Sequence, residues 1–122
     1  MKFENIDWID SDLEYINIEY NQAILKIWND SMRKFLQIKC TGLVGVTNLC
    51  IWDDTIITEI HVRPVSDRDS KFVHCVFEKY DKDYDYGGRV LSAGLIELKI
   101  HLASGIPFEI ICQSIDVMDC DS

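Results

Sequence analysis

The sequence lacks the segments that would direct it into or across a membrane. No apolar run approaches the roughly 18 residues that a membrane-spanning helix needs. The first residues, MKFENIDWIDSD, carry one lysine, then acidic residues, and no apolar core, so we do not expect a signal peptide. These absences predict a cytoplasmic protein that does not bind a membrane.

Cysteine is present, but it lacks the spacing of a disulfide framework or a zinc site. The five cysteines are an odd number, and no two of them form a CxxC pair. Cys40, Cys75 and Cys112 lie inside apolar runs, where cysteine behaves as a small hydrophobic residue. This pattern is typical of a reducing compartment.

Motifs for catalysis and phosphate binding are also missing. The sequence contains no GxSxG or HExxH, and GLVG (42–45) lacks the lysine and helix start of a phosphate-binding loop. His74 and Cys75 are adjacent, so in a strand they point to opposite faces. Acid pairs such as Glu59 and Glu97 arise by chance among 21 acidic residues. We therefore expect no catalytic residues and no cofactor.

Basic residues are scarce relative to acidic ones. The chain has 12 Lys and Arg against 21 Asp and Glu, for a net charge of -9. A field of this sign repels nucleic acid and anionic membranes and favours basic partners. Solubility alone is the alternative explanation of the charge.

What the sequence does have is two-residue alternation of apolar and polar side chains, which indicates strands. With 122 residues, 48% of them hydrophobic, we expect a single domain spanning 1–122. The expected strands are 13–20, 23–28, 34–40, 55–64, 71–80, 89–102 and 108–117, with one or two more in 41–52. The pattern predicts an all-β domain of seven or eight mainly antiparallel strands, as a sandwich or a partly closed barrel, with at most one short helix.

Some details of these strands can be checked individually. The residues expected on inward faces include Ile16, Ile18 and Tyr20 in the first strand, and Ile56, Ile60 and Val62 in 55–64. Asn21 and Gln22 are expected to form the first turn, and a kink is expected near Gly42 or Gly45. A helix over 22–36 is the alternative to a hairpin, although Asn29 to Ser31 is poor helix material.

The segment YDKDYDYGG resembles the start of a calcium loop. Asp81, Asp83 and Asp85 occupy alternate positions, as the first ligands of an EF-hand do. The sixth position is Tyr86 instead of glycine, and the twelfth is Ser92 instead of a bidentate glutamate. We therefore expect no EF-hand and no metal here; a looser cation site on Asp81, Asp83 and Asp85 is the alternative.

The same segment has a composition suited to protein docking. Tyrosine rings supply contact area at low entropic cost, and carboxylates pair with Arg and Lys of a basic partner. A solvated loop is the alternative. The expected protein-binding residues are Asp81, Asp83, Tyr84, Asp85 and Tyr86, with Asp53 and Asp54 as a second patch.

The three histidines offer a different hypothesis. His61, His74 and His101 are all expected on the face opposite the main apolar one, and three converging imidazoles would make a zinc site. We interpret them as unrelated surface histidines, because sequence does not show which strands are neighbours. The alternative function is a small-molecule-binding or enzymatic β-barrel with a pocket that uses these histidines together with Glu59 and Glu97.

The segments DLEYINIEYNQAILKIW, IWDD and GLIELKIHL, followed by PFEIICQSIDV, give the chain a resemblance to a group of short bacterial β-rich proteins. Some of that group look like immunity proteins of toxin systems. The resemblance implies a non-catalytic inhibitor that masks a basic toxin, and it assigns no functional residues. A third hypothesis is self-assembly, in which an edge strand near Pro64 or the final strand pairs with another copy of the chain.

Overall fold

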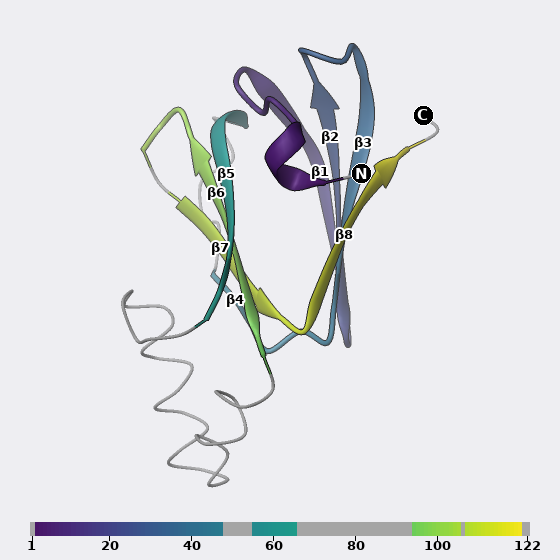
Figure 1. The fold of residues 1–122 in the computed structure, drawn as a ribbon, viewed down its shortest axis with the longest axis vertical. Helices are drawn as coiled ribbons and strands as arrows, with labels where there is room; N and C mark the ends of the chain where they lie inside the picture. Colours follow the sequence, from purple (N-terminus) through teal and green to yellow (C-terminus); the bar gives the residue numbers. More distant parts are fainter. Residues whose placement is uncertain (1, 48–54, 66–93, 106, 121–122) are drawn as a thin grey trace, which may run out of the picture.

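The structure of the protein is a computed structural model that describes residues 2–47, 55–65, 94–105 and 107–120. Apart from one 3-10 turn, η1 (Phe3–Asn5), the regular structure in these residues is β (Figure 1). The strands are β1 (Ser11–Glu19), β2 (Gln22–Asn29), β3 (Lys34–Thr41), β4 (Gly45–Val46), β5 (Ile56–Pro64), β6 (Ile96–Leu102), β7 (Pro107–Cys112) and β8 (Ser114–Asp119). The prediction of an all-β antiparallel fold is confirmed. Over the same residues, no helix has the length and apolar character needed to span a bilayer.

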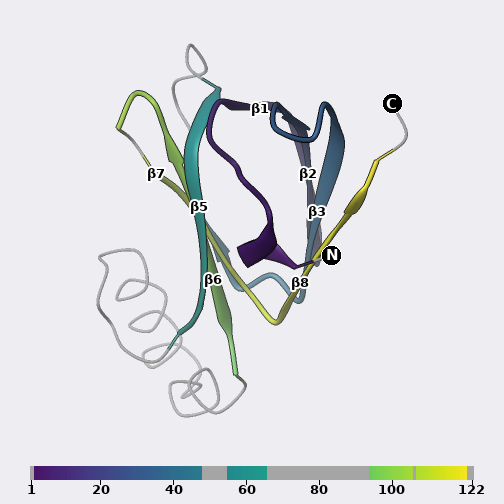
Figure 2. The same ribbon diagram turned by 45° about the horizontal axis from the view of Figure 1, so that its top comes forward.

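The eight strands form one sheet that is not closed, in the order β4-β7-β6-β5-β1-β2-β3-β8. The sheet bends so that two halves face each other, with β1, β2, β3 and β8 in one half and β4, β5, β6 and β7 in the other (Figures 1 and 2). The N-terminal segment with η1 lies between the halves (Figure 2). One apolar cluster joins them, with Leu25 and Ile38 from the first half and Ile100 and Phe108 from the second.

The antiparallel meander β1–β2–β3 shows why the helix alternative for 22–36 is wrong. Along β2, buried and half-buried residues alternate without interruption. The turn after β2 is held by Asn29, whose side-chain oxygen accepts a hydrogen bond from the Met32 amide at 2.8 Å and whose amide group donates to the Asp7 carbonyl at 2.9 Å. Polar residues that disfavour a helix therefore form a hairpin turn.

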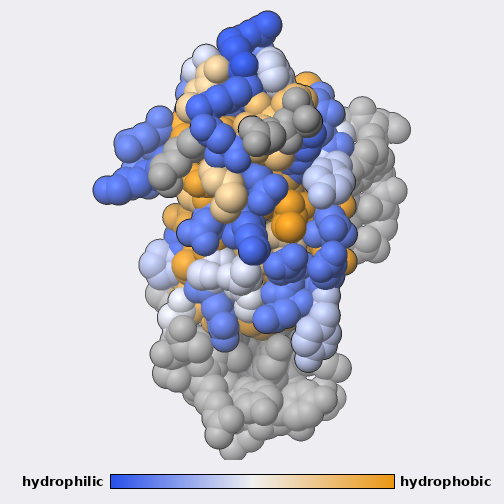
Figure 3. Space-filling model, turned by 90° about the vertical axis from the view of Figure 1, so that its right-hand side faces the viewer, coloured by the Kyte–Doolittle hydropathy of each residue, from blue (hydrophilic) through white to orange (hydrophobic). Residues whose placement is uncertain are grey.

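The outer side of β3 and β8 carries polar residues with apolar patches among them (Figure 3).

The kink expected near Gly42 is confirmed. Gly42 has a φ of 68°, and a side chain there would overlap the side chain of Gln113. The Gln113 amide donates to the carbonyls of Thr41 and Gly42 at 3.0 and 3.1 Å. The prediction of a single final strand over 108–117 is therefore wrong. The chain bends at Gln113, and the segment divides there into β7 and β8, one in each half of the sheet.

The end of β1 differs from the prediction. The turn is formed by Tyr20 and Asn21, because Gln22 already belongs to β2 and pairs with Glu19. Ile18 and Tyr20, expected inside, are 50% and 102% exposed. Among the described residues, the pairing of β1 with β5 is limited to Ser11 and Asp12 of β1. Within this part of the chain, the far end of β1 therefore has a strand neighbour on one side only, which is β2.

A β-bulge changes the inward face of β5. The pairing of β5 with β6 shifts between Ile57 and Glu59, so Ile57 is fully buried while Ile56, expected inside, is 39% exposed. One extra residue in a strand exchanges the inward-facing and outward-facing side chains among the residues that precede it. Ile60 packs against the core as predicted, whereas Val62 is 37% exposed.

Candidate functional site

The residues predicted to bind a protein lie outside the described residues, as does His74. These residues are Asp53, Asp54, Asp81, Asp83, Tyr84, Asp85 and Tyr86. The docking role of these two patches stays a prediction.

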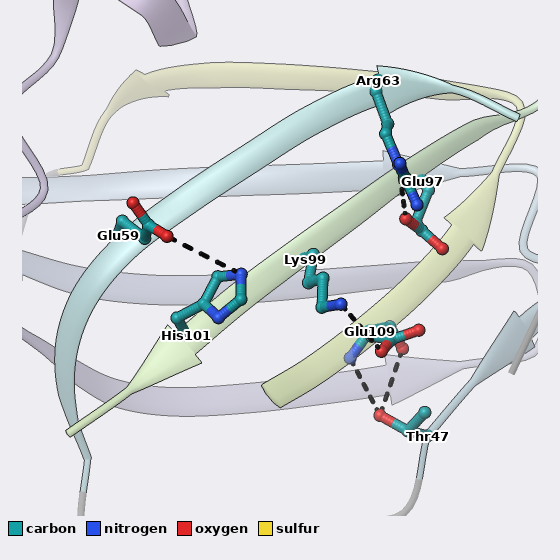
Figure 4. A network of polar contacts seen from close by, with 7 residues as sticks. All are labelled: Thr47, Glu59, Arg63, Glu97, Lys99, His101 and Glu109. Atoms are coloured by element: carbon teal, nitrogen blue, oxygen red, sulfur yellow. Dashed lines mark hydrogen bonds and ion pairs between the residues drawn. The ribbon is translucent and has the colours of Figure 1, made fainter. Parts of the chain in front are cut away.

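The outward side of β5, β6 and β7 carries a connected polar face (Figure 4). Strand register brings its side chains together: Glu59 lies opposite His101, Arg63 opposite Glu97, and Lys99 opposite Glu109. All of them point away from the apolar cluster because they alternate with core residues along β6 and β7. We call this surface the β5–β7 polar face; it consists of Glu59, His61, Arg63, Glu97, Lys99, His101 and Glu109.

Two of the three histidines converge on this face. The Nε2 atom of His61 lies 2.9 Å from Oε1 of Glu59, and Nε2 of His101 lies 3.9 Å from the same oxygen. The centroids of the two imidazole rings are 5.3 Å apart, and the rings are nearly perpendicular. Interpreting His61 and His101 as unrelated is therefore wrong: β5 and β6 are neighbours, and sequence alone does not contain that pairing.

Two carboxylates on the polar face are buried. Glu97 is 1% exposed and accepts a hydrogen bond from Arg63 Nε at 2.9 Å; Glu109 is 7% exposed, with Oε1 3.7 Å from Lys99 Nζ. Within the part of the chain that the structure describes, the second carboxyl oxygen of each glutamate has no hydrogen-bond partner. The backbone of Glu109 is anchored to the edge strand, because its amide donates to Thr47 Oγ1 at 2.8 Å. Burial raises the pKa of Glu109, and Lys99 opposes that shift.

A hollow of about 350 Å³ lies over this face, lined by His61, Arg63, Glu97, Lys99 and His101 among others. His101 is half-buried there, and burial lowers the pKa of its imidazole; Glu59 opposes that effect, and Lys99 and His61 reinforce it. His61, which also lines the hollow, has a side chain that is 56% exposed. It suits an ion or a small polar group better than a large apolar ligand.

A second candidate surface lies at the start of the chain. No basic residue occurs between Lys2 and Lys26, and six acidic residues do. Four of the eight large hydrophobic side chains that are exposed in the described residues fall in the same stretch. We call this the N-terminal acidic surface; its exposed members are Glu4, Asp7, Ile9, Asp10, Glu14, Tyr15, Ile18, Glu19 and Tyr20, and along β1 Tyr15 and Glu19 lie on the face opposite to Ile18.

Sequence reasoning misses the N-terminal acidic surface because the alternation in 13–20 predicts Ile18 and Tyr20 on the inward face. The sequence does carry a signal, since Glu14 precedes Tyr15 and Glu19 precedes Tyr20, which is the acid–tyrosine pattern of YDKDYDYGG. Comparison with known proteins adds no family to these observations: no family model, no curated protein and no solved structure matches the chain.

Proposed function

We propose that this chain is a non-catalytic binding domain that holds a basic protein partner through the N-terminal acidic surface. The observation that carries the proposal is the exposure of Tyr15 and Tyr20, each of which follows an exposed glutamate in the sequence, Glu14 and Glu19. Tyrosine is enriched at protein interfaces, where its ring supplies contact area and its hydroxyl a hydrogen bond.

The charge of this surface supports a basic partner. Neither Glu14 nor Glu19 forms an ion pair with a described residue, so both carboxylates are available to Lys and Arg of another protein. The net charge of -9 adds long-range attraction, which accelerates association and weakens as salt is added. A basic toxin masked by an immunity-type inhibitor is the partner class that we propose.

The shape of β1 supports extended contact. The strand is nine residues long and carries Tyr15 in its middle, with Tyr20 in the turn that follows. At about 3.3 Å per residue the strand runs for roughly 30 Å, which is enough for one side of a standard interface. Ile9, 59% exposed, lies just before the other end of the strand.

Capture from lysate of the native host tests the proposal. The wild-type chain is immobilised, the lysate is applied at low and high salt, and retained proteins are identified by mass spectrometry. We expect one basic protein, retained at low salt and released at high salt. Retention of an acidic protein, or of no protein in either arm, would contradict the proposal.

Variants of the same chain locate the contact. The double variant Tyr15→Ala/Tyr20→Ala should weaken binding of the identified partner by about 30-fold or more, because truncating an interface anchor costs about 2 kcal/mol. Glu14→Lys/Glu19→Lys should slow association. The matched control is Asp116→Lys/Asp121→Lys, which changes net charge equally but lies in the last residues of the sequence. Equal losses in both charge variants would mean that the N-terminal acidic surface is not the contact.

A further inference from the structure

The cluster of Glu59, His61 and His101 supports an inference that is independent of protein binding. We propose that these three side chains form a site for a divalent transition-metal ion, with Zn²⁺ the expected occupant. One ligand atom from each of the three residues lies within 4.8 Å of the others. Two imidazoles and one carboxylate are a ligand set that Zn²⁺ and related ions prefer.

The distances fit a metal ion after small side-chain shifts. Zinc lies about 2.0–2.2 Å from nitrogen and oxygen ligands, so two ligands of a tetrahedral site are roughly 3.4 Å apart. The observed separations from Glu59 Oε1 are 2.9 Å to His61 and 3.9 Å to His101, one below and one above that value. The third separation, between the two imidazoles, is at most 4.8 Å, so side-chain shifts of about an ångström are needed to bring all three atoms into range.

The backbone holds the three ligands on rigid elements. Glu59 and His61 are two residues apart on β5, so they share a face, and His101 is the cross-strand partner of Glu59 on β6. The bulge between Ile57 and Glu59 determines which face Glu59 occupies. Ligands on neighbouring strands are positioned more accurately than ligands on loops.

The surrounding charges are compatible with a cation. Two basic side chains lie nearby, and each is paired with a buried carboxylate, Lys99 at 3.7 Å from Glu109 and Arg63 at 2.9 Å from Glu97, which weakens their repulsion of a cation. A hollow of about 280 Å³ on the other side of Glu59 and His61 is also lined by Glu4 and Asp7, which add negative potential. The exposure of Glu59 and His61, 54% and 56%, leaves further coordination positions to water.

Titration of metal-free protein with Zn²⁺ tests the site. The protein is treated with a chelator, dialysed, and titrated by calorimetry, and Co²⁺ is used in parallel for its visible absorption. We expect one ion per chain. His61→Ala, His101→Ala and Glu59→Gln should each weaken binding by at least about 100-fold, because even the outer partners of metal ligands contribute 10–100-fold.

Two controls separate this site from other sources of binding. Glu14→Gln removes an exposed carboxylate outside the cluster and should leave the affinity unchanged. A Cys50→Ser/Cys75→Ser/Cys120→Ser variant should also retain binding, and the Co²⁺ complex should show no thiolate charge-transfer band. Loss of binding in the cysteine variant would assign the metal to thiols and overturn the proposal, as would unchanged affinity in the three ligand variants.

The ammonium group of Lys99 gives a further test. If His61 and Glu59 only paired with each other and bound no metal, the test would fail. Lys99 faces the cluster from β6, so Lys99→Gln should tighten Zn²⁺ binding by removing a like charge. Thermal unfolding without metal checks that each variant folds. No Zn²⁺ binding by folded wild-type protein at millimolar concentration would leave His61 and Glu59 as an ion pair and contradict the site.

Discussion

The two halves of the sheet differ in how they use their outward faces. In the half that contains β1, β2, β3 and β8, outward side chains remain in contact with water. Ile24, Lys26 and Trp28 on β2 are only half-buried, and the rings of Trp28 and Phe35 meet edge to face at 4.9 Å with Lys26 over Phe35. This face is a surface of aromatic rings and charges.

In the half that contains β4, β5, β6 and β7, the outward residues of β5 are exposed, but outward residues of β6 and β7 are buried. Five consecutive residues of β7 are buried, although a strand with one solvent face buries every second residue. Glu97, Glu109 and Ile111 point away from the apolar cluster and are nonetheless 1%, 7% and 0% exposed. Buried charges lower the stability of the fold unless they are paired. The stability of the half with β4, β5, β6 and β7 therefore depends on its ion pairs, whereas that of the other half does not.

The largest expected difference concerns two isoleucines on outward faces. Ile111→Ala should lower the free energy of unfolding by about 4 kcal/mol, because a fully buried side chain leaves a cavity. Ile24→Ala should lower it by no more than about 1 kcal/mol, since Ile24 is only half-buried. Urea unfolding measures both values. Equal losses would mean that the two faces are alike.

A smaller difference is expected between two ion pairs. Arg63→Met leaves the buried carboxylate of Glu97 without its cation and should cost about 3 kcal/mol. Lys34→Met breaks the pair with Asp119, in which both side chains are exposed, and should cost no more than about 1 kcal/mol. The same urea experiment compares the two variants. A loss in Arg63→Met as small as that in Lys34→Met would show that the pairing of Glu97 contributes little.

The smallest expected effect depends on pH. Burial raises the pKa of Glu109 in the folded protein above its unfolded value of about 4.3. The neutral carboxyl therefore favours folding below that value, and this contribution is lost as pH rises through the folded pKa. Glu109→Gln keeps the neutral form, so its stability relative to wild type should rise from acidic to neutral pH. Thermal unfolding across this range measures the trend, and a constant or falling difference would contradict it.

The local patterns and the tertiary contacts of the site were predictable to different degrees. Alternation in AILKIW predicted β2, and alternation in 55–64 and 89–102 placed His61 and His101 on a non-core face, where the structure has them. Their convergence with Glu59 was not predictable. It requires β5 and β6 to be neighbours in one register, and that register includes a bulge for which the sequence carries no clear signal.

By itself, the sequence determined the strand content, the antiparallel character and the acidic charge of this protein, because a period of two is a local property of any half-buried strand. Only the tertiary structure decided the division of the last predicted strand at Gln113, the exposure of Tyr20, and the burial of Glu97 and Glu109. These depend on which faces pack together and in what register. That choice is made between segments far apart in the chain, where a shift of one residue exchanges the inner and outer faces.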